Sequence, residues 1–299
     1  MTAPLGNSMF DRVALIGIGL IGSSLARVLR RDSPGTAIVA CARRAETLDA
    51  VRRLGIADQT TDDPAAAVAG ADLVVIATPL SAYGEVGRRI APALKPGAIV
   101  TDVGSVKEAA IRALAPLLLP AGVQFVPGHP VAGTEHSGPQ AGFAELFRDR
   151  WCILTPTPET LPEAVAKVTA LWEQAGMRVT VMAADHHDKV LAMTSHLPHL
   201  IAYTIVSTAT DLEDDLKSEV IAFSAGGFRD FTRIAASDPV MWRDIFLANR
   251  EAVLEMLQRF TEDLTALQRA IRWGEADTLE ERFTRTRAIR RSIIEAKQA

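Results

Sequence analysis

The chain contains 299 residues, of which 48% are hydrophobic and 23% are charged, and its formal net charge at pH 7 is −4. This composition suits globular cores, and the length predicts about two domains. A charge so close to balance gives no basis for binding nucleic acids or anionic membranes, so we expect neither kind of partner.

The N-terminal segment and the two cysteines indicate the compartment. Residues 1–8 lack the basic start and long apolar core of a signal peptide. No stretch of about 18 apolar residues runs without Gly, Pro or His, so we expect no membrane helix. Cys41 and Cys152 lie in apolar, strand-like runs, which indicates buried thiols in a reducing compartment. The sequence therefore predicts a soluble, cytoplasmic protein.

The first predicted strand, residues 12–17, runs directly into a glycine motif, Gly17-x-Gly19-x-x-Gly22, and a helical pattern follows. In dinucleotide-binding sheets the first glycine makes a tight turn and the second lets the backbone approach the pyrophosphate. The third lets the helix pack on the strand. We therefore predict a cofactor-binding turn, formed by Gly17, Gly19, Leu20, Ile21 and Gly22. The alternative is a glycine-rich turn that binds nothing.

The second predicted strand, residues 37–42, bears on the kind of cofactor. NAD-binding sheets place Asp or Glu at the end of this strand, where the carboxylate holds the ribose 2′-hydroxyl. Here the chain continues with Arg43 and Arg44, whose guanidinium groups attract a 2′-phosphate. We therefore expect NADP to be favoured over NAD. The alternative is that both arginines begin a solvated helix and that either cofactor is accepted.

Short apolar strands alternate with helices as far as residue 184. Further strands are predicted at 73–78, 98–102, 123–127, 151–155 and 178–182, with helices at 45–54 and 161–176 among them. This alternation predicts an α/β fold, with an N-terminal Rossmann-type, doubly wound, mostly parallel sheet. Ligands bind at the carboxyl ends of such strands. Cofactor contacts are therefore predicted for Thr78, Pro79 and, within the segment 102–107, Ser105.

Residues 129–139 gather three titratable side chains in a segment rich in Gly and Pro. His129, Glu135 and His136 lie within eight residues, and this composition predicts a loop. A loop that combines a base, an acid and small residues is typical of an active-site wall.

From about residue 185 the strand signals stop and the chain reads as helices. Four histidines follow within fourteen residues: His186, His187, His196 and His199. Histidine–aspartate pairs bind metals in phosphohydrolases, but no further carboxylates follow here at suitable spacing, so we predict no metal site. We expect one or two of the four to contact substrate, with His186 or His187 a surface or capping residue.

Arg233 follows an aromatic stretch that begins with two glycines, at residues 226–232. Its planar guanidinium can hold a substrate carboxylate with two hydrogen bonds. The alternative is an arginine on a helix surface with its stem packed along apolar neighbours.

Two long helices are predicted near the C-terminal end. Asp238 and Pro239 give the first a start signal, Gly274 ends it, and Asp277 is expected to cap the second. Apolar residues of the first helix form one seam, at Leu254, Leu257, Phe260, Leu264, Leu267 and Ile271. An intramolecular core face would explain the seam, but so few long helices have little core of their own, so we also expect a homodimer. The predicted domains are residues 1–184 for the dinucleotide and the all-helical residues 185–299 for substrate and dimerisation.

Together these motifs resemble the prephenate/arogenate dehydrogenase family of tyrosine biosynthesis, over almost the whole chain. Besides the glycine motif, the resemblance depends on Asp102-x-Gly104-Ser105-Val106-Lys107, His129-Pro130-x-x-Gly133-x-Glu135-x-Ser137-Gly138, Ser195-His196-x-Pro198-His199 and Phe231-Thr232-Arg233-Ile234-Ala235. These four motifs, in this order, are specific to the family. The resemblance implies an NAD(P)-dependent oxidative decarboxylation of prephenate to 4-hydroxyphenylpyruvate, of arogenate to tyrosine, or both.

The resemblance also implies roles for individual residues. His129 is the general base that accepts the proton of the C4 hydroxyl, and Ser105 hydrogen-bonds this histidine and the hydroxyl. Arg233 binds the substrate carboxylate, and the other substrate-binding residues implied are His199, Glu135 and Ser195. Ser195 is also implied to touch the nicotinamide amide.

Two other interpretations stay open. A β-hydroxyacid or imine dehydrogenase also couples a nucleotide domain to a helical dimer domain, but it depends on a lysine, and Lys189 and Lys217 lack a matching context. A non-catalytic NAD(P)-sensing protein would show no turnover. The preference between prephenate and arogenate also stays open, because no acidic residue can be placed beside the group that differs.

Overall fold

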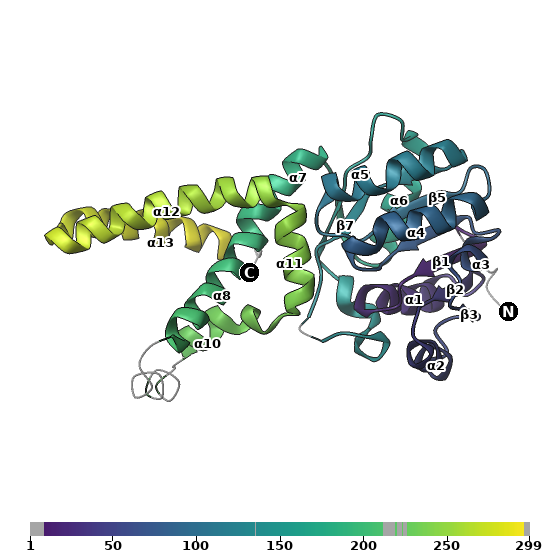
Figure 1. Cartoon of the computed structure of the whole chain (residues 1–299), viewed down its shortest axis with the longest axis horizontal. Coiled ribbons are helices and arrows are strands. Elements are labelled where there is room, and N and C mark those ends of the chain that lie inside the picture. Colours follow the sequence, from purple (N-terminus) through teal and green to yellow (C-terminus); the bar gives the residue numbers. More distant parts are fainter. Residues whose placement is uncertain (1–8, 135, 212–218, 220–222, 224–225, 296–299) are drawn as a thin grey trace. The chain divides into compact units, whose positions relative to one another are not determined.

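The computed structural model describes residues 9–134, 136–211, 219, 223 and 226–295. Its contacts divide the chain into two compact units, Met1–Arg250 and Glu251–Ala299, which are described separately. Figure 1 labels most of their helices and several of their strands. The predicted domain boundary at residues 184 and 185 differs from this division and stays a prediction.

The first unit is built around a six-stranded parallel sheet. Its strands are β1 (Arg12–Ile16), β2 (Ala37–Cys41), β3 (Gln59–Thr61), β4 (Leu73–Ile76), β5 (Ile99–Asp102) and β6 (Gln124–Val126), in the order β3-β2-β1-β4-β5-β6. The chain runs outward from β1 to β3 and then returns to β4 on the other side of β1. This reversal confirms the predicted doubly wound fold, whose ligands bind where the strand order reverses.

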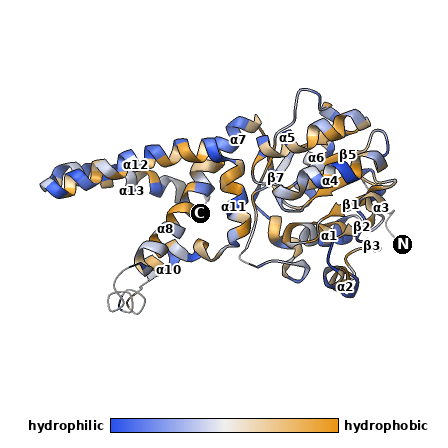
Figure 2. Cartoon of the chain, viewed as in Figure 1, coloured by the Kyte–Doolittle hydropathy of each residue, from blue (hydrophilic) through white to orange (hydrophobic). Residues whose placement is uncertain are grey.

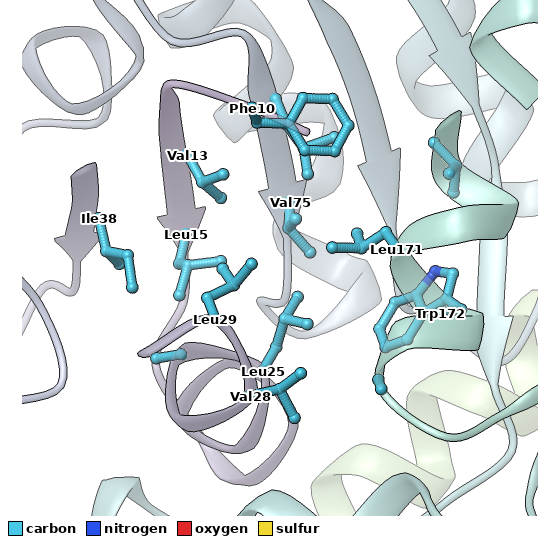
Figure 3. Packing of buried hydrophobic residues seen from close by; sticks show 14 of the residues in the cluster. Phe10, Val13, Leu15, Leu25, Val28, Leu29, Ile38, Val75, Leu171 and Trp172 are labelled. Carbon is cyan, nitrogen blue, oxygen red and sulfur yellow. The ribbon is translucent and has the colours of Figure 1, made fainter. Parts of the chain in front are cut away.

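Two layers of helices cover the sheet because alternate residues of its strands point to opposite faces. Val13 and Leu15 pack toward α1 (Leu20–Asp32) and α6 (Pro162–Gln174), together with Leu25, Leu29, Leu171 and Trp172 (Figure 3). Ala14 and Ile16 pack on the opposite face, toward α3 (Pro64–Val68), α4 (Tyr83–Ile90) and α5 (Lys107–Leu118). The continuous apolar strands of Figure 2 are therefore buried on both sides.

Helix α2 (Ala45–Leu54) confirms the sequence prediction and strand β3 adds to it. The helix has the predicted bounds, and β3 was not predicted, since its residues Gln59, Thr60 and Thr61 carry no apolar signal. Both cysteines are free and buried, as predicted.

A second sheet carries the start of the segment predicted as a loop. It contains β7 (Gly128–Pro130), β8 (Trp151–Leu154) and β9 (Arg178–Val181), with β7 antiparallel and β9 parallel to β8. The loop prediction for 129–139 is therefore wrong at its first two residues, His129 and Pro130. Pro130 is tolerated because β7 lies at the edge of its sheet, where a missing N–H costs no ladder bond.

The first unit continues with helices α7 (Ala184–Leu191), α8 (Leu197–Thr210), α10 (Gly226–Thr232) and α11 (Pro239–Ala248), and a π-helical turn, Ala192–His196, joins α7 to α8. These helices pack on the sheet domain through Val106 at the start of α5 and through Trp242 and Ile245 of α11. Asp238 caps α11 as predicted, accepting hydrogen bonds from the backbone of Val240 and Met241.

The predicted long helix after Pro239 is interrupted, which corrects the sequence prediction. Helix α11 ends at Ala248, and α12 (Arg250–Trp273) begins after Asn249. Asn249 is buried and its side chain donates to the carbonyl oxygen of Asp188 at 2.8 Å. The break is therefore fixed by a polar contact with α7.

The second unit consists of nearly all of α12, and of α13 (Ala276–Glu295). Gly274 ends α12 with a φ of 68°, as predicted, and Arg282 pairs with Asp263 between the helices. Asp277 lies in the first turn of α13 and is not its cap, because α13 begins one residue earlier. Of the predicted seam, Leu254, Leu264 and Ile271 are more than half exposed. The seam is therefore not an intramolecular core within the described chain.

One stretch, Ala184–Thr210, is long and apolar enough to cross a membrane by length and composition. It holds the buried polar side chains His187, Asp188 and His196, which favours a helix packed inside a protein. The expected absence of a membrane helix stays a prediction.

Candidate active site

The turn between β1 and α1 has the geometry of a dinucleotide cradle. Gly17 has a φ of 94°, and a Cβ there would lie 2.5 Å from the carbonyl oxygen of Ala77. A Cβ on Gly22 would lie 2.3 Å from the carbonyl oxygen of Gly17. Around Gly19, in contrast, no heavy atom of the described residues lies within 4 Å of a Cβ position. Two glycines therefore permit close packing, and the third leaves space beside the N-terminus of α1 for a phosphate group.

A cavity of about 300 Å³ opens beside this turn, at the carboxyl ends of β1, β2 and β4. Six of the predicted cofactor residues line it: Gly17, Gly19, Arg43, Arg44, Thr78 and Pro79. The other four, Leu20, Ile21, Gly22 and Ser105, are not among its lining residues. The buried Oγ1 of Thr78 has no hydrogen-bond partner among the described residues, and no acid lies in the first turn of α1. These features fit a nicotinamide dinucleotide.

The charges around the cavity are mixed. Besides the two predicted arginines, Arg89 lines it, together with the carboxylates Asp62 and Glu85, none of which was predicted. Arg89 pairs with Asp63 at 3.1 Å, so part of its charge is neutralised. Three arginines near one cavity favour an anionic group, although two carboxylates weaken that field.

A loop after β7 is fastened to α1 and forms one wall of the cavity. Gly138 and Pro139 line the cavity, and the carbonyl oxygen of Pro139 accepts a hydrogen bond from Arg27. The backbone N–H of Phe143 donates to Ser24 Oγ at 3.1 Å. These contacts join the segment predicted as an active-site wall to the helix that begins at the glycine turn.

A buried ion pair joins β5 to the strand that carries His129. Asp102 Oδ2 accepts hydrogen bonds from Lys107 Nζ at 2.6 Å and from the hydroxyl of Tyr83 at 2.9 Å. Lys107 Nζ also donates to the carbonyl oxygen of Gly128 at 2.6 Å. Burial lowers the pKa of Lys107, and the charge of Asp102 opposes that shift. Burial raises the pKa of Tyr83, and Asp102 raises it further.

His129 is buried and begins a chain of hydrogen bonds. Its Nδ1 lies 2.9 Å from Nε2 of His187, and Nδ1 of His187 lies 2.7 Å from Oδ1 of Asp188. Asp188 also accepts hydrogen bonds from the backbone N–H groups of Lys107 and Glu108 at the start of α5. Burial lowers the pKa of His129 well below its ordinary value of 6.5, and His187, Lys107 and His196 lower it further. His129 is therefore a neutral imidazole at neutral pH.

Two further histidines continue this cluster along the π-helical turn and α8. The Nδ1 of His196 lies 3.1 Å from the side-chain nitrogen of Asn249, and burial lowers the pKa of His196 to about 4. His199 stacks on Trp242, with ring centroids 3.5 Å apart and planes 21° apart. Its Nδ1 donates to the carbonyl oxygen of Ser195 at 2.9 Å, which leaves Nε2 as an acceptor in the neutral ring.

The structure connects Arg233 to this cluster through its charge. Burial lowers the pKa of His199, the hydrogen bond to Ser195 opposes that shift, and the charge of Arg233 lowers the pKa further. Arg233 is exposed at the end of α10. The charges of His129 and His196, of His196 and His199, and of His199 and Arg233 thus influence one another.

For three predicted site residues, no side-chain contact with the histidine cluster is described. Ser105 is half-buried in the turn between β5 and α5, and no hydrogen bond joins it to His129 among the described residues. Ser195 is half-buried and contributes its carbonyl oxygen to His199. Glu135 lies outside the described residues.

The main residues that the sequence prediction did not assign are Asp102, Lys107, His187, Asp188 and Asn249. The sequence signal was present for four of them, since Asp102 and Lys107 stand in the motif at 102–107, and His187 and Asp188 lie in the histidine–aspartate cluster. His187 is fully buried and His186 is exposed, so His186 is the surface residue of the two. In the described part of the chain, no group of three or more His, Cys, Asp or Glu side chains is placed to hold a metal ion.

Two family profiles match the chain. Residues 25–181 match the family described as "Prephenate dehydrogenase, nucleotide-binding domain". Residues 183–285 match "Prephenate dehydrogenase, dimerization domain".

A curated relative and solved structures agree with these matches. The chain is 43% identical to a cyclohexadienyl dehydrogenase of Zymomonas mobilis, over 96% of this chain and 97% of the relative. It is similar to the prephenate dehydrogenase of Aquifex aeolicus in complex with hydroxyphenyl propionate and NAD+. The TM-score is 0.87 at 34% identity, over 95% of this chain and 98% of that one. The arogenate dehydrogenase of Synechocystis gives a TM-score of 0.79 at 28% identity, over 94% and 99% of the two chains.

The two profiles begin after the glycine turn and cover the histidine cluster, and the match to the Zymomonas relative spans 96% of the chain. Together they exclude the β-hydroxyacid or imine dehydrogenase interpretation. The chain belongs to the prephenate dehydrogenase family of oxidoreductases.

Proposed function

We propose that the chain oxidises and decarboxylates prephenate, arogenate or both, with His129 as the general base. The observation that supports the proposal is that His129 is buried and neutral, in a protein whose glycine turn has the geometry of a dinucleotide-binding site. In the reaction, C4 of the substrate ring loses a hydride, its hydroxyl loses a proton and the ring carboxylate leaves as CO₂. The electrons of the broken C–C bond then make the ring aromatic. A nicotinamide cofactor, when bound, supplies the hydride acceptor.

His129 moves the proton in this proposal. With its Nδ1 directed at His187, Nε2 is the nitrogen left for the substrate, and no described residue hydrogen-bonds it. Nε2 accepts the hydroxyl proton as C4 becomes a carbonyl carbon. Loss of CO₂ then places negative charge on the same oxygen, so His129 can return the proton to it. Proton transfer of this kind contributes about 10²–10⁴-fold to rate.

Arg233 would hold a substrate carboxylate, and His199 would bind a hydrogen-bond donor of the substrate. Arg233 offers an exposed guanidinium, and Nε2 of His199 accepts from a donor on the substrate. The stack on Trp242 holds the His199 ring in place. The family resemblance further assigns substrate binding to Glu135. It also assigns to Ser195 a contact with substrate and the nicotinamide amide, and to Ser105 a hydrogen bond to the substrate hydroxyl.

The cofactor is held by the glycine turn and the strand ends, and we infer that NADP is favoured over NAD. The pyrophosphate would lie against Gly17, Gly19, Leu20, Ile21 and Gly22, and Thr78, Pro79 and Ser105 would contact the nicotinamide half. Arg43 and Arg44 line the cavity where a 2′-phosphate would lie. No acid stands at the end of β2, which supports this preference.

The same proposal extends to assembly and location. Residues 1–184 bind the cofactor, and residues 185–299 bind substrate and pair two copies of the chain. The exposed apolar residues of α12 and the match to a dimerization domain support a homodimer. As a dehydrogenase acting on small molecules, the protein is proposed to work in the cytoplasm without nucleic-acid or membrane partners.

The experiment is steady-state reduction of NADP and of NAD with prephenate and with arogenate, followed at the absorbance of the reduced nicotinamide. Turnover with either substrate supports the reaction, and the four values of kcat/KM give both preferences. Absence of turnover in all four would leave the non-catalytic, cofactor-sensing interpretation. A higher kcat/KM for NAD than for NADP would contradict the cofactor preference alone.

A further inference from the structure

We propose that His187 and Asp188 are positioning residues for His129, which fix its tautomer so that Nε2 is unprotonated and faces the substrate. The proposal rests on the proposed function of His129 as base. It assigns a task to two buried residues of α7 that touch neither the cofactor cavity nor the glycine turn.

The argument starts at Asp188, whose two oxygens receive three N–H donors. The backbone N–H of Lys107 donates to Oδ1 at 2.7 Å and that of Glu108 to Oδ2 at 3.0 Å. The third donor is Nδ1 of His187, 2.7 Å from Oδ1. A carboxyl group that accepts from every neighbour is ionised, and the N-terminus of α5 further favours its negative charge. Nδ1 of His187 therefore carries a hydrogen.

The tautomer of His187 then determines that of His129. In a neutral ring with hydrogen on Nδ1, Nε2 holds a lone pair and can only accept. Because Nδ1 of His129 lies 2.9 Å from this Nε2, it must be the donor. The two rings meet edge-on, with planes 70° apart, which suits a hydrogen bond directed into a lone pair. Nε2 of His129 is left without hydrogen, ready to accept a proton.

The hydrogen bonds from His129 to His187 and from His187 to Asp188 also stabilise His129 after it accepts that proton. An imidazolium donates more strongly through Nδ1, and the charge of Asp188 reaches it through His187. The charged and titratable groups that act on His129 are His187 of α7, Lys107 of α5 and His196 of the π-helical turn. Asp188 reaches His129 through His187, and Asp102 of β5 pairs with Lys107. Cys152 lies on the neighbouring strand β8, opposite Pro130. Lys107 opposes the positive charge, and Asp102 largely neutralises Lys107. Asp188 is therefore the carboxylate that supports protonation along a continuous hydrogen-bond path.

Two substitutions of the same residue separate positioning from packing. His187→Gln keeps a carbonyl oxygen that can accept from Nδ1 of His129, whereas His187→Leu offers no acceptor. Nitrogen NMR of the ¹⁵N-histidine-labelled full chain reports the tautomer, with the signals of His129 identified by their loss in His129→Asn. We expect hydrogen on Nδ1 in the wild type and in His187→Gln, and a shift toward hydrogen on Nε2 in His187→Leu.

The kinetic outcome is predicted to follow the tautomer. In His187→Leu, kcat falls about 100-fold, at the lower end of what acid–base catalysis contributes, with KM changed less than about threefold. His187→Gln recovers most of this loss, and Asp188→Asn shifts the acidic limb of the pH profile of kcat to lower pH. Thermal unfolding of each variant separates these effects from loss of structure.

Two results would overturn the proposal: hydrogen on Nε2 of His129 in the wild type, or equal kcat and pH profiles in His187→Leu and the wild type. If His187→Leu does not fold, the proposal is still tested by the tautomer in the wild-type NMR spectrum. The kcat values and pH profiles of His187→Gln and Asp188→Asn then supply the comparison. Absence of turnover in the wild type would contradict the proposed function, whereas the tautomer measurement would still test the hydrogen-bond chain.

Discussion

Lys107 Nζ donates to the carbonyl oxygen of Gly128 at 2.6 Å, one residue before His129. The same ammonium pairs with Asp102 at the end of β5, and both side chains are fully buried. A single lysine thus ties the central sheet to the small sheet that carries the proposed base. Its position at the start of α5 also places its backbone N–H against Asp188. Lys107 therefore supports His129 in two ways: its side chain binds the residue before His129, and its backbone binds the Asp188 carboxylate.

Lys107→Met is expected to destabilise the protein severely. Removal of the ammonium leaves Asp102 buried without its charged partner, a change that costs about 3–5 kcal/mol. Lys95→Met is the matched control, because it breaks a partly exposed pair with Asp72 that is worth about 0–1 kcal/mol. Urea unfolding of both variants measures the loss in the free energy of unfolding. Equal losses in the two variants would show that the buried pair has no special role.

The glycines of the turn are expected to separate binding from stability. Gly19→Ala leaves the free energy of unfolding within about 0.5 kcal/mol of the wild type, since its Cβ would enter open space. It raises the Kd for the dinucleotide at least about tenfold, because the methyl group occupies the approach of the pyrophosphate. Gly22→Ala instead destabilises by about 1–3 kcal/mol, because its Cβ would meet the carbonyl oxygen of Gly17.

Calorimetric titration and thermal unfolding distinguish these two variants. Unchanged dinucleotide affinity in Gly19→Ala would contradict the position given to the pyrophosphate. A Gly22→Ala variant as stable as the wild type would mean that the turn relaxes without cost.

Arg43→Asp is expected to reverse the cofactor preference. A charged hydrogen bond to a 2′-phosphate contributes about 1.5–3 kcal/mol, and an aspartate at this position repels the phosphate. The ratio of kcat/KM for NADP over NAD should fall at least about tenfold. Arg53→Asp is the control, since Arg53 is exposed on α2 and does not line the cavity. An unchanged ratio in Arg43→Asp would contradict the assignment of this arginine.

Stability is expected to fall as the pH drops below about 6.5. Burial is the main cause that lowers the pKa of four histidines: His129, His187, His196 and His199. Between the folded and unfolded pKa values, the unfolded chain therefore binds more protons than the folded chain. The stabilisation is complete above the unfolded pKa of 6.5 and is lost as the pH falls toward the folded value, about 4 for His196. That residue alone corresponds to about 3 kcal/mol.

Urea unfolding between pH 7.5 and pH 4 gives the slope of stability against pH. His196→Gln should flatten it, whereas His186→Gln, which changes an exposed histidine of α7, should leave it unchanged. A wild-type stability that is constant over this range would contradict the burial of the histidine cluster.

Local patterns predicted the parts of the site that lie close together in sequence. The glycine turn, the apolar strands and the bounds of α2 follow from short-range sterics and from burial on both faces. The cavity lining was predicted for Gly17, Gly19, Arg43, Arg44, Thr78 and Pro79 because strand ends of a parallel sheet meet at one edge.

The sequence analysis missed contacts between residues that are far apart in sequence, because no local pattern reports them. His129 and His187 are 58 residues apart, and their contact requires β7 and α7 to meet. The motif at 102–107 contains Asp102 and Lys107, but only the folded chain brings the Lys107 ammonium to both Asp102 and the carbonyl oxygen of Gly128. The break at Asn249 is set by α7 in the same way, because a good helical pattern runs on both sides of it. Strands β3 and β7 were missed because Gln59–Thr61 and Gly128–Pro130 contain no apolar run, whereas β6, which is equally short, lies within one and was predicted.

The most direct test compares the wild type with His129→Asn in the presence of saturating NADP and either cyclohexadienyl substrate. Substrate loss, reduced nicotinamide and CO₂ are measured together, and cofactor affinity is measured separately by calorimetric titration. We expect the three rates to be equal in the wild type and to fall together by about 10²–10⁴-fold in the variant, with cofactor affinity unchanged. A variant that turns over at the wild-type rate would contradict the role of His129, and a wild type that releases no CO₂ would contradict the reaction itself.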